Sequence, residues 1–395
     1  MKLLFKNAEI VLFDRNILGS LITDNKIIKN IGKIDEDSKI EINCENLKIF
    51  PGFIDTHVHG GYGFDFEQNN VDSYKGFAKN VVKEGVTKFV LASVTSTPEK
   101  ISSCLKTFSK YYFDQDYDYA ICLGVHLEGP FISIEKKGAH EQCLILKPDV
   151  NLMNQWIIDS SNLIKIVTFD IENDEDSKFL KFLNSKNIIG SVGHCNSTSK
   201  TFKTKAGDVG CYRVTHLYNG MSGLLHSNPG VASAALNDPR VLCELICDGF
   251  HVDKDLIKIT YLCKGSRNIT LITDAMIAKG MNDGYYKLGQ LEVEKKNGIC
   301  TLKNTTTLAG SVTTYDKCFK NFHDWIQPSD QELAHISSYN SAIQLGLKNT
   351  GLIKENYLAD LVLVNKNYEV VMTVCEGNIA YINSKYKSIL VSKGK

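Results

Sequence analysis

The stretch IFPGFIDTHVHG at residues 49–60 places two histidines, His57 and His59, where a buried apolar strand is predicted to end. Alternate residues of a strand point to the same side, so both imidazoles can reach one point at the carboxyl end of this strand. Imidazole is the commonest side-chain ligand of metals in proteins. The pair therefore suggests a metal at the mouth of a sheet or barrel, while HxH alone leaves a plain polar pair on a loop as the alternative.

Further apolar runs follow this stretch and alternate with polar or amphipathic segments. Runs this continuous are typical of strands that are buried on both faces of a parallel sheet. Eight such strands separated by helices predict an α/β fold of the (β/α)8 TIM-barrel type. The predicted strands lie at residues 48–55, 87–94, 119–127, 164–171, 188–193, 211–216, 241–248 and 268–273.

Amphipathic segments between and after these runs predict helices. The segment 73–85 offers Ser73 as its N-cap and brings Phe77 and Val81 to one face. In the last predicted helix Ser329 is followed by Glu332, which is a capping-box pattern. The other predicted helices lie at 174–186, 253–264 and 313–326, and the last one spans 329–348.

The sequence pattern differs at the two ends of the chain, where it predicts short strands and turns instead of alternating strands and helices. We expect residues 1–47 and 353–395 to pair into a small β-sandwich domain. Residues 48–352 would then form the (β/α)8 barrel.

Composition excludes several function classes. The 45 Lys and Arg residues balance the 45 Asp and Glu residues, so the chain has no overall field that would gather nucleic acid or an anionic membrane. No signal peptide opens the chain, and no apolar stretch approaches the roughly 20 residues that span a bilayer. The twelve cysteines are scattered, and Cys243 and Cys247 are predicted to fill core space. A cytoplasmic protein with reduced thiols and a small-molecule ligand is the simplest interpretation.

Polar residues recur just past the predicted strands, in the order Glu128, His194, His216, His251 and Asp274. The carboxyl ends of barrel strands converge on one face, where catalytic residues gather. Glutamate and histidine suit Zn²⁺ or Fe²⁺, and such a metal lowers the pKa of a bound water to about 7. Asp274 is the best candidate to take and later return the proton, with a metal ligand or an N-cap as its alternative roles.

Eight motifs together resemble the amidohydrolase superfamily and, within it, the N-acetylglucosamine-6-phosphate deacetylase family. The resemblance covers most of the chain, and its most specific parts are HLEGPF, KKGAH and THLYNGM. It implies hydrolysis of a linear amide, the acetamide of N-acetylglucosamine 6-phosphate, in amino sugar metabolism. The full set of motifs is PGFIDTHVHGG, HLEGPF, KKGAH, GHCNST, THLYNGM, DGFHV, LITDAM and LAGS.

The resemblance also implies roles for individual residues. Glu128, His194 and His216 would hold the main metal, and His57 and His59 would add a second position that shares Glu128. Asp274 would be the general base and acid. His140 would hydrogen-bond the acetyl carbonyl, unless it is simply a surface-loop histidine. The substrate would be lined by Ala139, His140, Asn219, Gly220, Ser227, His251, Leu308, Ala309 and Gly310, with plain packing as the alternative for Leu308 and Ala309.

One position departs from the family pattern. Relatives carry an arginine that clamps the phosphate, and its place here is taken by Ser227. Serine offers one neutral hydrogen bond where arginine offers a charged bidentate contact. Lys136, Lys137, His226 or a residue of a neighbouring subunit could compensate, or the ligand could be another N-acetyl sugar, such as N-acetylgalactosamine 6-phosphate. A homodimer is expected from the resemblance, and His323 and His335 are interpreted as structural.

Two other function classes stay open at this point. Many cyclic amidases bridge two metals with a carboxylated lysine at the fourth strand, but the run KIVTFDI at 165–171 has no lysine at its carboxyl end. The fold alone is equally compatible with a barrel that only serves as a scaffold for partners. Such a scaffold would be expected to lose its ligands, whereas here the whole set is present.

Overall fold

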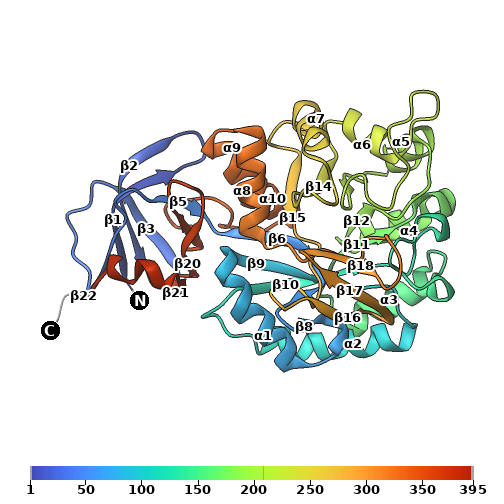
Figure 1. Ribbon diagram of the computed structural model, residues 1–395, viewed down its shortest axis with the longest axis horizontal. Helices are drawn as coiled ribbons and strands as arrows, with labels where there is room; N and C mark the ends of the chain where they lie inside the picture. The colour runs from blue at the N-terminus through green and yellow to red at the C-terminus, as the bar shows by residue number, and fades with distance from the viewer. Residues whose placement is uncertain (1, 208, 393–395) are drawn as a thin grey trace.

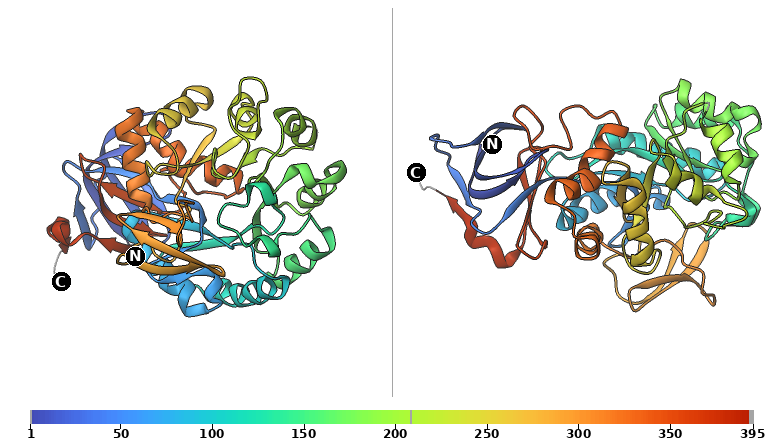
Figure 2. Two further views of the ribbon diagram at one scale, coloured as in Figure 1. Left: turned by 45° about the vertical axis from the view of Figure 1, so that its right-hand side comes forward. Right: turned by 90° about the horizontal axis from the view of Figure 1, so that it is seen from above.

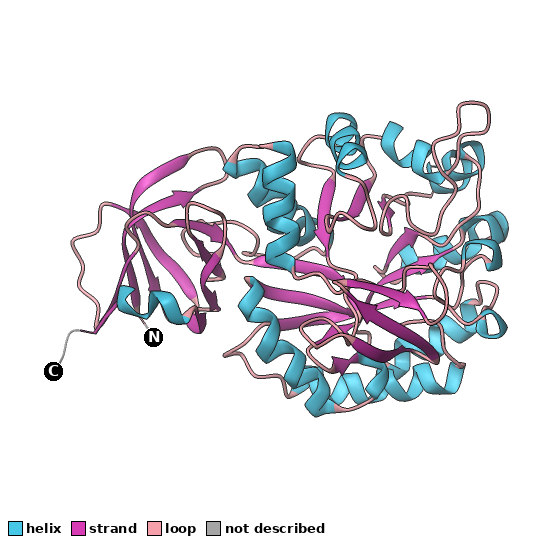
Figure 3. Cartoon of the chain, viewed as in Figure 1, coloured by secondary structure: helices cyan, strands magenta, loops and turns pink. Residues whose placement is uncertain are grey.

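Two sheets that share no strand organise the molecule (Figure 1). The computed structural model describes residues 2–207 and 209–392. Eight strands form a parallel sheet ringed by helices, and a separate nine-stranded sheet combines both ends of the chain (Figures 1 and 3). The predicted fold class, a (β/α)8 barrel with a small terminal β-layer, is therefore confirmed.

The barrel strands follow one another in chain order from the first to the last, as a (β/α)8 fold requires. Every pairing between neighbours is parallel. Their side chains are almost all buried, which explains the continuous apolar runs of the sequence. The strands are β6 (Phe53–Val58), β9 (Val86–Ala92), β10 (Ile121–Glu128), β11 (Ile164–Phe169), β12 (Ile189–Val192), β13 (Arg213–Val214), β14 (Leu242–Ile246) and β15 (Ile269–Ile272).

Backbone hydrogen bonds just past the strands close the barrel between β6 and β15. Asp274 N donates to His57 O at 2.9 Å, and His59 N donates to Ala275 O at 2.8 Å. The Thr273 hydroxyl donates to the buried Asp55 carboxylate at 2.6 Å. The seam of the barrel therefore lies at the two predicted site segments.

The predicted first barrel strand at 48–55 is divided between the two sheets. Residues Lys48–Pro51 form β5, which pairs with β1 and β19 of the terminal sheet, and only the following residues enter the barrel as β6. Gly52 lies between the two strands. A larger residue does not fit there, because its Cβ would collide with the Thr87 side chain. Because β5 pairs in the terminal sheet, we propose to move the first domain boundary from Lys48 to Gly52, and the second boundary after residue 352 stays a proposal.

The helices cover the outside of the barrel (Figure 3). Helix α1 begins after Asn70, whose side chain accepts a hydrogen bond from Asp72 N, so the prediction of Ser73 as N-cap is wrong. The capping box of Ser329 and Glu332 is confirmed, although the helix that it opens passes through a π-helical segment at His335–Tyr339. The helices are α1 (Val71–Val81), α2 (Pro98–Phe113), α3 (Val150–Asp159), α4 (Lys178–Ser185), α5 (Ser199–Gly207), α6 (Val231–Asn237), α7 (Lys254–Lys264), α8 (Tyr315–Ile326), α9 (Asp330–Ala334) and α10 (Asn340–Gln344).

The terminal sheet branches at β1, which pairs with β2, β4 and β5. Its strands enclose an apolar core of their own, which includes Phe5, Leu21, Ile42, Leu361 and Met372. Lys88 of the barrel forms a buried ion pair with Asp360 at 2.9 Å, which ties the two sheets together. The strands are β1 (Leu3–Val11), β2 (Asn16–Asp24), β3 (Ile27–Gly32), β4 (Ile40–Asn43), β5 (Lys48–Pro51), β19 (Leu361–Val364), β20 (Val370–Cys375), β21 (Asn378–Ile382) and β22 (Leu390–Ser392).

A small antiparallel sheet follows β15 and was not predicted (Figure 2). It consists of β16 (Gly284–Leu288), β17 (Leu291–Lys296) and β18 (Ile299–Leu302). Its Leu288 packs against Val94, past the end of β9, in an apolar cluster with Met276. The described residues include no helix that is both long and apolar enough to cross a membrane.

Candidate metal centre and active site

The predicted site residues meet at the carboxyl ends of the barrel strands. His57 lies in β6 and His59 directly after it, Glu128 ends β10, and His194, His216 and Asp274 follow β12, β13 and β15. A pocket of about 250 Å³ opens here. Its lining consists of His59, Val94, Glu128, Gly138, Ala139, His140, His194, His216, Asn219, Gly220, His251, Asp274, Leu288, Thr307, Leu308 and Gly310.

Glu128 lies at the centre of the site. Its Oε1 is 2.8 Å from His216 Nε2 and 3.3 Å from His194 Nε2, and these two nitrogens are 3.1 Å apart. The three side chains are buried. They form one group whose ligand atoms all lie within 4.8 Å of one another, which is a donor set that suits a divalent metal.

A second group shares Glu128 on its other side. Glu128 Oε2 is 3.3 Å from His59 Nε2, which in turn is 3.1 Å from Asp274 Oδ1. His57 Nε2 is 3.5 Å from Glu128 Oε1 and 3.6 Å from Asp274 Oδ1, beyond hydrogen-bond distance. No described residue hydrogen-bonds this buried nitrogen. The geometry thus offers two neighbouring metal positions with one carboxylate between them.

The opposite ring nitrogens of two ligands are fixed by acceptors. His194 Nδ1 donates to the backbone oxygen of Lys136 at 2.7 Å, so its Nε2 carries the lone pair that faces Glu128. His57 Nδ1 donates to Glu244 Oε2 at 2.9 Å, so Nε2 is the nitrogen that can bind a metal once it loses its proton. Such contacts set the tautomer of metal-binding histidines and the direction of their rings.

The charges of the site fit a cation. Burial opposes charge on all these groups, but the carboxylates outweigh it at three histidines: the pKa of His57 lies well above its usual value, that of His216 is raised, and that of His59 is raised to about 10. Burial likewise would raise the pKa of Glu128, yet the surrounding histidines hold it well below its usual range. Protons on the histidines thus neutralise two buried carboxylates here, and a divalent metal would supply that charge in their place.

Three of these residues have a left-handed backbone, which is uncommon for residues other than glycine. The φ angles are 46° at His194, 30° at His216 and 50° at Asp274. Each residue lies two positions past the end of a barrel strand, where the chain turns away from the barrel. Such conformations cost on the order of 1–3 kcal/mol each and concentrate at functional sites.

His140 faces the same pocket from the loop after β10. The Thr95 backbone N–H donates to His140 Nδ1 at 3.2 Å, so Nδ1 is an acceptor and the proton lies on Nε2. Burial lowers the pKa of His140 to about 3, which keeps the ring neutral. His140 Nε2 lies 3.7 Å from Glu128 Oε2, so this N–H points towards the metal group rather than to the surface.

The residues expected around the substrate divide into three sets. Ala139, Asn219, Gly220, His251, Leu308 and Gly310 line the pocket. Ala309 is fully buried in the apolar cluster of Val94 and Met276, which is the packing alternative for this residue. Ser227 and His226 are exposed and are not among the residues that line the pocket. The phosphate role of Ser227 therefore stays a prediction.

Sequence reasoning missed a buried polar group beneath the site. His126 precedes Glu128 by two residues on β10 and packs against His57 with ring centroids 4.3 Å apart. Arg213 and Glu244 are fully buried on β13 and β14 and form an ion pair at 2.7 Å. The signal was present in the sequence, because a charged residue inside an apolar strand needs a partner.

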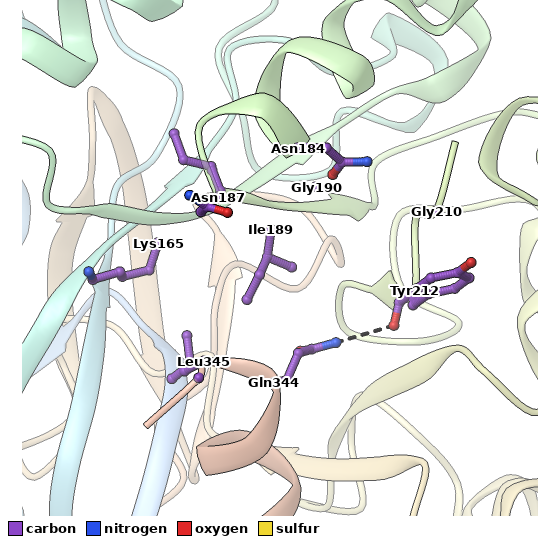
Figure 4. A pocket seen from close by; sticks show the side chains of 11 residues that line it. Lys165, Asn184, Asn187, Ile189, Gly190, Gly210, Tyr212, Gln344 and Leu345 are labelled. Atoms are coloured by element: carbon purple, nitrogen blue, oxygen red, sulfur yellow. Dashed lines mark hydrogen bonds between the residues drawn. The ribbon is translucent and has the colours of Figure 1, made fainter. Parts of the chain in front are cut away.

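Another hollow lies at the other end of the strands (Figure 4). It has a volume of about 580 Å³ and is lined by residues before or at the starts of β11, β12 and β13, among them Lys165, Ile189 and Tyr212. Gln344 lies in it and donates to Tyr212 O. Carboxyl ends carry the chemistry of such barrels, and this hollow is at the amino ends.

Comparison with known proteins agrees with this geometry. Residues 49–380 match the model of the amidohydrolase family. The chain is 34% identical over 388 residues to an N-acetylglucosamine-6-phosphate deacetylase of Bacillus subtilis, covering 94% of this chain and 98% of the relative. It is 32% identical over 331 residues to an N-acetylgalactosamine-6-phosphate deacetylase of Escherichia coli, covering 84% and 87%.

Solved structures of similar proteins agree with the sequence comparison. The N-acetylglucosamine-6-phosphate deacetylase of Thermotoga maritima superposes with a TM-score of 0.87 at 34% identity, over 96% of this chain and all of the other. A mutant of the Mycobacterium smegmatis enzyme in complex with N-acetyl-D-glucosamine-6-phosphate superposes with a TM-score of 0.90 at 26% identity, over 96% and 99%. With its barrel, its shared glutamate and its strand-end histidines, this chain belongs to the amidohydrolase family.

Proposed function

We propose that this protein is a metal-dependent deacetylase that hydrolyses N-acetylglucosamine 6-phosphate to glucosamine 6-phosphate and acetate. The observation that carries the proposal is the pocket in which Glu128, the strand-end histidines and Asp274 meet. Two relatives that align over 94% and 85% of this chain are named for this activity. The enzyme is thus a hydrolase of a linear amide in amino sugar metabolism.

Each step of the hydrolysis can be assigned to residues of the pocket. A divalent metal held by Glu128, His194 and His216 would polarise the acetyl carbonyl and lower the pKa of a water. Asp274 takes the proton of the attacking water and passes it to the amine nitrogen as the C–N bond breaks. The histidines of the site hold the pKa of Asp274 below its usual value despite its burial, so the carboxylate is ready to accept this proton.

His140 stabilises the oxygen of the acetyl group. Its neutral ring presents Nε2–H to the pocket, where the carbonyl oxygen gains negative charge during attack. A donor that is fixed in place before the reaction stabilises this charge without reorganisation. Thr95 fixes the ring through its backbone N–H and its hydroxyl, which is 2.7 Å from Nδ1.

Replacing His140 with leucine is expected to lower kcat by about 10²–10³-fold with a small change in KM, the usual effect of losing one oxyanion donor. Steady-state acetate release measures both constants. His140→Gln is the matched control, because its amide can accept from Thr95 N and still donate into the pocket, so it should keep more activity. Equal activity of the leucine variant and the wild type would contradict the role.

Zn²⁺ or Fe²⁺ are our proposed metals, because the donor set mixes imidazole and carboxylate. Two metals per chain are proposed from the two groups that share Glu128. The homodimer and the cytoplasmic location stay predictions from the sequence. The phosphate contact is proposed to come from the pocket rim rather than from the exposed Ser227, with Lys136 as a cationic candidate, whereas the Lys137 ammonium already donates to His140 O at 3.2 Å.

Acetate release tests the proposed substrate directly. We expect turnover of N-acetylglucosamine 6-phosphate and far lower kcat/KM for unphosphorylated N-acetylglucosamine. N-acetylgalactosamine 6-phosphate is included as the second candidate, since one similar relative is named for it. Equal activity with and without phosphate would refute phosphate recognition, and no acetate from any of these sugars would refute the function.

A further inference from the structure

We propose that Glu244 is a positioning residue that orients His57 and thereby sets the affinity of the second metal position, the one formed by His57, His59 and Glu128. The inference rests on the metal centre of the proposed function and concerns a residue that does not line the pocket. Glu244 lies on β14, inside the barrel, and has no exposed surface.

Both oxygens of Glu244 accept hydrogen bonds from residues that build the site. Oε2 accepts from His57 Nδ1 at 2.9 Å and from the backbone N–H of His216 at 3.1 Å. Oε1 accepts from Nε and Nη2 of Arg213 at 2.9 and 2.7 Å. One carboxylate thus links the side chain of one predicted ligand to the left-handed backbone of another.

Arg213 holds this carboxylate in place. Its guanidinium also donates to the Thr56 hydroxyl and to Gln344 Oε1, which lies in the hollow at the opposite end of the barrel (Figure 4). Arginine cannot give up its proton in a protein, so its partner stays an acceptor. The pKa of Glu244 accordingly lies far below its usual value, because Arg213 and His57 outweigh the effect of burial.

The consequence concerns the direction of His57. With Nδ1 donating to Glu244, Nε2 faces Glu128 and Asp274 at 3.5 and 3.6 Å, and its lone pair becomes available when a metal ion replaces the proton on this nitrogen. The ring of His126 packs against His57 and limits its rotation. A carboxylate behind the ring also raises the basicity of the metal-facing nitrogen.

Glu244 could alternatively bind a metal itself together with His57 and His126, since these three side chains also lie close together. The contacts argue against this, because the oxygen nearest Arg213 is occupied and His126 Nε2 is 2.7 Å from the Thr168 hydroxyl. A cation between them would lie next to the buried guanidinium of Arg213, which repels it. The group therefore supports the site and does not form one.

Glu244→Gln tests the proposal with almost no change of shape. The charged Arg213 would take the amide oxygen, so the amide NH2 would face His57 Nδ1 and favour the tautomer with a proton on Nε2. We expect the second Zn²⁺ to bind about 10–100-fold more weakly. The Zn²⁺ at Glu128, His194 and His216 should lose less affinity, because the lost oxygen contacts the backbone N–H of His216 and not its ring. Competitive Zn²⁺ titration measures both affinities, and ¹¹³Cd resonances count the filled positions.

A paired variant separates positioning from mere stability. In Arg213→Met with Glu244→Gln, no cation competes for the amide oxygen, which can again accept from His57, so the second Zn²⁺ should return to within a few-fold of wild-type affinity. Arg213→Met with Glu244→Leu leaves His57 Nδ1 without an acceptor, so this variant should not recover the affinity for the second Zn²⁺. These two variants bury no unpaired charge, so they carry the test even if Glu244→Gln alone does not fold.

Asp360→Asn is the matched control, because it removes a buried carboxylate from an ion pair with Lys88 that lies between the two sheets. We expect this variant to bind Zn²⁺ at both metal positions with the affinities of the wild type. Unchanged binding of the second Zn²⁺ in Glu244→Gln, or equal binding in the two double variants, would overturn the proposal. Zn²⁺ is measured without substrate, so a protein that binds as expected but releases no acetate would refute the proposed function and not the role of Glu244.

Discussion

Asp274→Asn is expected to lower kcat of acetate release by about 10³-fold or more, within the range of losing a general base and acid. Such a loss corresponds to about 4 kcal/mol of transition-state stabilisation. The amide keeps the shape of the side chain and can still pair with His59 Nε2, which lies 3.1 Å from Asp274 Oδ1. It cannot take a proton, so the step from the attacking water to the amine fails.

Metal analysis of the same variant separates the two roles of Asp274. We expect near-normal metal at Glu128, His194 and His216, because the asparagine lies in the other group of ligands. An asparagine variant with activity within tenfold of wild type would refute the role of Asp274 as general base and acid. Loss of a metal along with activity, at the second position above all, would instead support the alternative role of Asp274 as a ligand.

Glu128→Gln is expected to empty both metal positions and to abolish acetate release. The glutamate is the one carboxylate common to the two groups, and its two oxygens face different histidines. Glutamine offers one weakly coordinating oxygen without charge, while its NH2 would point at imidazole nitrogens that need to bind a cation. Metal content after gel filtration and acetate release measure the two effects.

The contrast with the histidine pair makes this prediction specific. Replacing both His57 and His59 with asparagine should remove at most one metal, because His194 and His216 stay on Glu128 Oε1. Both sets of variants remove buried polar groups at the same pocket, so a general loss of folding would affect them alike. Equal metal loss in the two would contradict a shared glutamate with two separate positions.

The order of elements was predictable because burial on both faces leaves a continuous apolar signal. Every predicted barrel strand has its counterpart, and the helix begun at Ser329 starts as its capping box requires. The first strand was misplaced, since no apolar pattern reveals that Pro51 and Gly52 carry the chain from one sheet to another. The sheet β16–β18 was missed although Asn297 and Gly298, both with positive φ, join two of its strands in a typical hairpin turn.

The site was predictable wherever its residues stand at strand ends. His57, His59, Glu128, His194, His216 and Asp274 could be expected to meet from the barrel alone, because its geometry brings these ends together. Thr95 contributes its backbone N–H to His140, and a backbone contact leaves no mark in the sequence. The positions of Ser227 and Ala309 depend on loop conformation, which strand and helix patterns do not determine.

The seam between β6 and β15 gives the site an order of assembly during synthesis. Glu128, His194 and His216 come from β10, β12 and β13, so their metal group needs only the middle of the chain. The Asp55–Thr273 contact joins residues 218 positions apart, and His59 meets Asp274 across the same seam. A ribosome therefore has to deliver the last barrel strand before the histidine pair, which emerges early, can contribute to a complete centre.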